Sequence, residues 1–191
     1  EKSTLTARGI PGDRAWTLKD EESGGIKGGK RFPQLLDMSA RFMNEPTEQV
    51  VSPPVQITLN DGRSISSSDP QVNETLSAEV DAPVSLWPLL PADQLEHYQR
   101  PPMDDGVDPE AYFREVFARA ADEPLPDLSV FPEELFIYES SPGTYFDAFP
   151  ILLMSQASLR HFEQIMLEQG SESQFDVRRF RPNILVETEE S

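Results

Sequence analysis

Eighteen prolines are spread along this 191-residue chain, and they limit the length of every regular element. A proline inside a helix removes a backbone hydrogen bond and clashes with the preceding turn, and in a sheet it is confined to edges and strand ends. Many of the prolines stand between short apolar runs. We therefore predict a mainly β fold with helices (α+β), built from short strands, and not a helical bundle.

Strand patterns dominate the first half of the chain. Residues 15–18 alternate around two large apolar side chains, and residues 54–59 place every second side chain on one apolar face. The Asn-Asp-Gly sequence at 60–62 predicts a hairpin turn before 64–66. A further apolar run at 84–89 is interrupted by proline, which favours an edge strand.

Two helices are predicted in the second half. Asp108 followed by Pro109 is typical of a helix N-terminus, and an apolar stripe at helical spacing is expected to face the core. That stripe consists of Phe113, Val116, Phe117 and Ala120. Between the two helices, residues 128–131 and 135–138 are predicted to form short strands or edge segments.

The second helix is expected to begin after Ser155 and to end at Gly170. Its predicted buried face carries Leu159, Phe162 and Met166. The hydroxyl of Ser155 suits an N-cap, and the helix N-terminus after it also suits an anion. The two interpretations are compatible.

The charge of the chain argues against nucleic acid as a partner. The formal net charge is −18, from 34 acidic and 16 basic residues, and such a chain repels a phosphate backbone. The longest apolar run is far shorter than the roughly 20 residues that a membrane-spanning helix needs. We expect a cytoplasmic protein without a membrane partner.

The sequence offers little material for metal ligation. It contains no cysteine and only two histidines, His97 and His161, which are far apart in sequence. A thiolate nucleophile, a disulfide framework and a histidine-based zinc site therefore find no support. Residues 24–30 match the start of a phosphate-binding loop, but Arg31 stands where the loop needs Ser or Thr. We predict no metal ligands in this chain and assign no catalytic residue.

The one dense basic cluster consists of Arg178, Arg179 and Arg181, followed by Pro182. It is either a solvated or acid-paired turn, or an anion site, because arginine suits bidentate phosphate recognition. In a strand, Arg179 and Arg181 would point to one face and Arg178 to the other. At most two of the three are then expected to share a ligand.

Two separated stretches carry a family resemblance. GIPGDRAW near the start, followed by KRFPQL, pairs with DAFPILLMSQASL and RRFRPNILV near the end. In this order the motifs resemble the MOSC family, the molybdenum cofactor sulfurase C-terminal domain. The resemblance runs from about residue 7 to 186, and it implies a MOSC-type β-barrel with a preceding β-rich N-terminal domain. We place that N-terminal domain at 1–95 and the first part of the MOSC core domain at 96–191.

The resemblance also implies a cofactor site. In the matching motifs Arg181 and Asn183 would bind molybdopterin, and Arg14 would lie by its phosphate. The segment with Asp147 and Phe149 would line the same pocket. From the residues themselves, we add Ser155 at the helix N-terminus and Arg179 beside Arg181 as cofactor-binding candidates.

Two functions follow from these features. The first is a molybdenum-cofactor protein that acts on a small-molecule substrate, either by reducing N-hydroxylated compounds with a redox partner protein or by transferring sulfur. The second is a non-catalytic module that uses the basic pocket for an anion or a protein partner. Pyridoxal phosphate accompanies sulfurase relatives of the family, but no lysine here marks a Schiff base.

The cysteine motif that ligates molybdenum in the family would lie after Ser191, and an early lysine-serine motif would lie before Glu1. We therefore expect the chain to be a fragment of a longer protein. The cofactor is then expected only in the full-length protein.

Overall fold

The computed structural model describes residues 5–6, 8–102, 106–130, 132–146, 149–171 and 175–187. Its strands are β1 (Trp16–Asp20), β2 (Ile26–Lys27), β3 (Ser39–Phe42), β4 (Val55–Thr58), β5 (Ser64–Ser66), β6 (Val84–Pro88), β7 (Leu153–Ser155) and β8 (Ile184–Val186). Its α-helices are α1 (Val72–Val80), α2 (Leu95–Tyr98), α3 (Pro109–Val116), α4 (Glu134–Ile137) and α5 (Gln156–Glu168). Three 3-10 helices are η1 (Pro33–Leu36), η2 (Leu128–Val130) and η3 (Val177–Arg179).

The first half of the chain folds into two antiparallel sheets of three strands each. One has the order β2-β1-β6 and the other the order β3-β4-β5. Strand β6 pairs with β1 along its whole length, so that Trp16 lies opposite Pro88 and Asp20 opposite Val84. The prediction of strands at 15–18, 54–59 and 84–89 is therefore confirmed. The predicted turn at 60–62 joins β4 to β5, with Gly62 at φ +86°.

The hydrophobic core lies between these sheets and α1. Alternate residues of β4 point inward, as their spacing predicts, and the apolar face of α1 packs against β6. The buried members of this core are Leu18, Phe32, Val55, Ile57, Leu59, Val72, Leu76, Val80 and Val84. All of them belong to residues 18–84, so the predicted N-terminal domain contains this entire cluster.

A buried carboxylate closes the turn between β1 and β2. Asp20 is 1% exposed, and its Oδ1 accepts hydrogen bonds from the backbone N–H groups of Glu22 and Ser23. Its Oδ2 lies 3.5 Å from Nε of Arg31. Burial raises the pKa of Asp20, but the hydrogen bonds together lower it by more than burial raises it. The pKa of Asp20 therefore lies below its ordinary value.

The segment from α3 to α4 differs from its prediction. Asp108 caps α3 by accepting from the N–H of Glu110, as expected. The apolar stripe does not face a core, since Val116 is 41% and Phe117 39% exposed. Residues 128–130 and 134–137 form the helical turns η2 and α4, so the prediction of strands there is wrong; Phe131 lies outside the described residues. Short apolar runs do not distinguish a strand from one helical turn.

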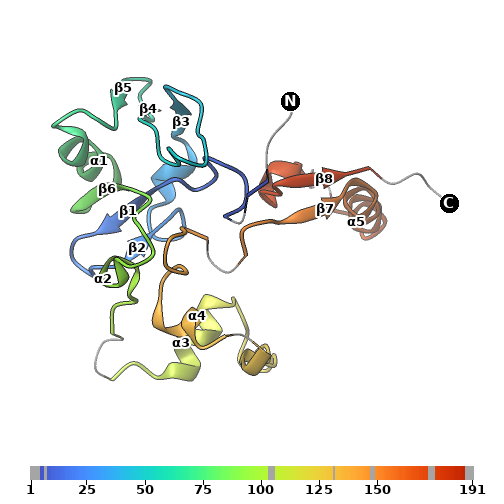
Figure 1. Ribbon diagram of the computed structural model, residues 1–191. Helices are drawn as coiled ribbons and strands as arrows, with labels where there is room; N and C mark the ends of the chain where they lie inside the picture. The colour runs from blue at the N-terminus through green and yellow to red at the C-terminus, as the bar shows by residue number, and fades with distance from the viewer. Residues whose placement is uncertain are drawn as a thin grey trace.

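The last elements form a β-α-β unit. Strands β7 and β8 pair in parallel, with Leu153 opposite Ile184, and α5 connects them. Ser155 caps α5, and Gly170 ends it with φ +80° and the two hydrogen bonds of a Schellman motif. Both helix ends match the sequence prediction. Figure 1 shows this unit beside the two sheets, and α3 and α4 in a separate group.

The predicted buried face of α5 is only partly buried. Leu159 is 8% exposed, whereas Phe162 is 39% exposed and contacts Phe175 edge to face. Met166 is half-buried. Helical spacing identifies the apolar face but not how much of it is covered.

The fold is thus mixed α+β, as predicted at that level. Across the described ranges the strands form three small sheets and no closed barrel. In the same part of the chain, no helix has the length and apolarity needed to cross a membrane.

Candidate functional site

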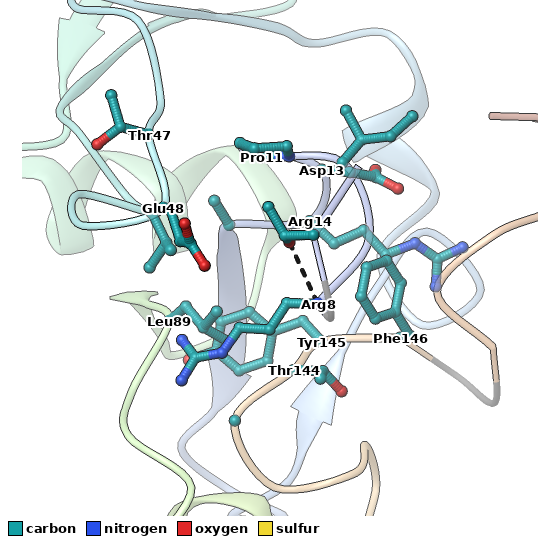
Figure 2. A pocket seen from close by; sticks show the side chains of 16 residues that line it. Arg8, Pro11, Asp13, Arg14, Thr47, Glu48, Leu89, Thr144, Tyr145 and Phe146 are labelled. Atoms are coloured by element: carbon teal, nitrogen blue, oxygen red, sulfur yellow. Dashed lines mark hydrogen bonds between the residues drawn. The ribbon is translucent and has the colours of Figure 1, made fainter. Parts of the chain in front are cut away.

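A pocket of about 290 Å³ lies where the loop before β1 meets residues 143–146 (Figure 2). The loop supplies one wall, residues 143–146 supply the opposite wall, and residues 47–51 close one side. Its charged lining residues are Arg8, Asp13, Arg14 and Glu48. Arg14 is therefore the predicted site residue that the structure places in the pocket.

Two glycines give this loop its path. Gly9 and Gly12 have φ of +89° and +86°, a region that side chains with a Cβ rarely adopt. A Cβ on Gly12 would lie 2.6 Å from Cγ of Pro46 and 2.9 Å from Cε2 of Phe42. Glycine is thus favoured at positions 9 and 12, because the loop turns sharply while packed against neighbouring side chains.

The opposite wall is aromatic. The guanidinium carbon of Arg14 lies 5.6 Å from the centroid of the Phe146 ring, a cation–π distance. Figure 2 shows Arg14 extending across Phe146, while Arg8 extends toward the other side of the pocket, where Glu48 lies. Tyr145, next to Phe146 in sequence, is 6% exposed and belongs to the same wall of the pocket. The pocket therefore combines two cations and two carboxylates with a wall of largely buried aromatic side chains.

Tyr145 is fixed by a buried polar network. Its hydroxyl donates to the carbonyl of Pro88 at 2.7 Å and lies 2.8 Å from Nε2 of His97. Burial raises the pKa of Tyr145, with Tyr98 adding to the effect. Burial also lowers the pKa of His97, helped by the charge of Lys19. Both side chains are thus neutral at neutral pH.

The end of the chain reaches the pocket loop through Asn183. Its Nδ2 donates to Oδ2 of Asp13 at 2.5 Å, although the two residues are 170 positions apart. Its Oδ1 accepts from the N–H of Leu152, and its own N–H donates to the carbonyl of Leu152. This side chain therefore joins the GDR sequence to the RPN sequence and to the start of β7.

Two arginines of these sequences have a strained backbone. Among the described non-glycine residues, φ is positive at Arg14 (+49°), Asp81, Ala118 and Arg181 (+52°). Asp81 and Ala118 follow helices α1 and α3, where left-handed residues are common. Arg181 precedes a proline, which normally favours extended backbone. Strain of this kind concentrates at functional sites.

The remaining predicted site residues are more scattered. Ser155 serves as the N-cap of α5, and Phe149 is 69% exposed. Arg179 ends η3 and lies over Phe175, and Arg181 is exposed. Since 177–179 form a 3-10 helix and Arg181 has positive φ, the arginines do not lie in a strand, and the side-chain alternation considered for a strand does not apply. Asp147 lies outside the described residues.

The sequence reasoning missed Arg8 and Tyr145. Arg8 stands six positions before Arg14, and a second cation so close in an acidic chain was a usable signal. Tyr145 had no such signal, because its role depends on contacts with α2 and β6. Among the residues that the structure describes, no group of three or more His, Asp or Glu side chains is arranged to hold a metal ion.

Comparison with known proteins adds no relative: no family model, no curated protein and no solved structure matches this chain.

Proposed function

We propose that the pocket between residues 8–14 and 143–146 binds the phosphate of an organic cofactor. The ligand that the motifs favour is molybdopterin, with the chain forming part of a MOSC-type architecture. The observation that carries this proposal is the hydrogen bond between Asn183 and Asp13. This bond joins the GDR and RPN sequences, which both contribute to the family resemblance. Asp13 lines the pocket together with Arg8 and Arg14.

The chemistry of the lining suits such a ligand. Arg8 and Arg14 present guanidinium groups, which bind phosphate through paired charge-assisted hydrogen bonds. Tyr145 and Phe146 also line the pocket, each only 6% exposed, so they offer apolar edges against which a fused heterocycle can pack. A phosphorylated pterin has both a phosphate and such a ring.

The bound cofactor would supply redox or sulfur-transfer chemistry at its molybdenum. Reduction of N-hydroxylated compounds, with a redox partner protein, and sulfur transfer are the two reactions that the resemblance implies. The residues of this chain would bind and orient the phosphate and the pterin. The sequence contains no cysteine, so the thiolate that relatives give the metal would have to come from outside residues 1–191.

Arginine substitutions test the phosphate site. We expect Arg8→Gln and Arg14→Gln each to weaken binding of a phosphorylated pterin by roughly 10-fold to 100-fold, since a hydrogen bond to a charged group contributes about 1.5–3 kcal/mol. Isothermal titration calorimetry measures the affinity. The matched control is Arg41→Gln, which removes one cation from exposed strand β3, away from the pocket.

An unchanged affinity in both pocket variants would contradict the proposal. Equal losses in the pocket variants and in Arg41→Gln would mean that only overall charge matters. Thermal unfolding of each variant, measured alongside, shows whether a loss of affinity reflects a loss of folding.

The second candidate is a non-catalytic module that binds a phosphorylated metabolite in the same pocket. The absence of cysteine from the sequence favours it. Molybdenum and pterin content of the full-length gene product separates the two functions. If the purified full-length protein carries neither, the non-catalytic module is the better account.

A further inference from the structure

His97 is buried behind the pocket and is not one of its lining residues. It lies on α2, is 8% exposed, and its ring packs between Trp87 of β6 and the rings of Tyr98 and Tyr145. The contact with Tyr145 includes the hydrogen bond of 2.8 Å. His97 thus links α2 to Tyr145, whose hydroxyl is also bonded directly to Pro88 of β6.

The direction of that hydrogen bond follows from the partners of Tyr145. A phenol has one proton, and the Tyr145 hydroxyl donates it to the carbonyl of Pro88, which can only accept. The hydroxyl oxygen must then accept from His97, so Nε2 carries the proton of the neutral imidazole. A second proton could add only at Nδ1.

No charged group that acts on the ring favours a second proton at Nδ1. The titratable or charged groups that face the ring are Lys19 from β1, Tyr98 from α2 itself and Tyr145; β6 contributes Trp87, which does not titrate. Within the described ranges, no side chain or carbonyl accepts a hydrogen bond from Nδ1. A buried imidazolium beside Lys19 and without an acceptor is costly, so protonation favours conformations that expose the ring.

We propose that His97 is a positioning residue of the pocket: its neutral form holds Tyr145 in the wall, and protonation releases that wall and weakens anion binding. This inference rests on the proposed function, since it concerns the same pocket. The direction of the effect follows from linkage. We call the contact between neutral His97 and Tyr145 the latch. Because the pKa of His97 is lower in the folded protein than in the unfolded chain, the latch is complete above about pH 6.5 and is lost as the pH falls below that value.

Sulfate is the appropriate probe, because its charge does not change between about pH 5 and 8, where histidine titrates. In the wild type we expect the sulfate affinity, measured by calorimetry, to fall by up to about tenfold per pH unit below the His97 pKa. In His97→Gln the amide Nε2 can still donate to Tyr145 but does not titrate. This variant should keep the affinity at neutral pH and lose the dependence on pH. His97→Phe should bind weakly at every pH, and His161→Gln should behave as the wild type.

A His97→Gln variant that retained the full pH dependence would overturn the proposal. A second readout separates it from the pocket assignment. With two histidines in the sequence, His161→Gln assigns the His97 C2–H resonance, and its titration can be compared with the ring resonances of Tyr145. If the His97 and Tyr145 resonances titrate with the same midpoint, the latch is supported even if no anion binds. Tyr145 resonances that do not change with the His97 titration would refute it.

Discussion

Gly12→Ala is expected to lower the free energy of unfolding by about 2–5 kcal/mol. The backbone at Gly12 has φ +86°, and placing a side chain in the left-handed region costs roughly 1–2 kcal/mol. The new Cβ would also lie 2.6 Å from Pro46 and 2.9 Å from Phe42, and overpacking of this kind costs about 1–3 kcal/mol. Urea unfolding measures the change.

Gly24→Ala is the matched control. Gly24 also has positive φ, +75°, but no atom lies within 4 Å of the Cβ that it would carry. We expect it to cost only the backbone part, about 1–2 kcal/mol. The difference between the two variants isolates the packing of the pocket loop against residues 42 and 46. Equal destabilisation would mean that the loop is not pressed against them.

Asp20→Ala is expected to destabilise the protein by about 2–4 kcal/mol. The carboxylate is buried and accepts from two backbone N–H groups, and a hydrogen bond to a charged group contributes roughly 1.5–3 kcal/mol net. Arg31 also loses its partner, although its side chain is 57% exposed and contributes little. Urea unfolding at neutral pH gives the value.

Asp61→Ala makes the comparison internal. Asp61 likewise accepts from the N–H two residues later, that of Arg63, but its side chain is 48% exposed. Water replaces the lost acceptor there, so we expect a change below about 1 kcal/mol. An Asp61→Ala effect as large as that of Asp20→Ala would show that burial is not what makes Asp20 important.

The Asp20 carboxylate also makes the stability of the protein depend on pH. Its pKa is lower in the folded protein than in the unfolded chain, so its contribution is complete above the unfolded value and is lost as the pH falls through the folded value. Stability of the wild type should therefore decline in acid more steeply than that of Asp20→Ala.

The sequence was most informative where a local pattern has one structural solution. Alternation in 54–59 and the Asn-Asp-Gly turn defined a hairpin, because alternating apolar side chains share one face of a strand and that face must be buried. Ser155 and Gly170 defined both ends of α5, because capping depends on residues within one turn. The prediction that the apolar stripe of α3 faces the core was wrong, since helical spacing does not show what covers a stripe.

The site was harder to predict because it is made of distant segments. Arg14 was identified from its motif, yet Arg8 and Tyr145 share its pocket only after residues 6–15 and 143–146 meet. Asn183 was predicted as a ligand of the cofactor, and in the structure its side chain is hydrogen-bonded to Asp13 and Leu152. The backbone after η3 turns at Arg181, and no periodicity in the sequence signals that turn.

Phosphate binding at the loop before β1 can be tested by following the backbone amide NMR shifts during titration with a phosphorylated pterin. We expect the largest shifts in residues 8–14 and 143–146. Shifts concentrated instead at Arg179 and Arg181, with the pocket loop unchanged, would contradict this expectation and would place the anion on the exposed basic turn.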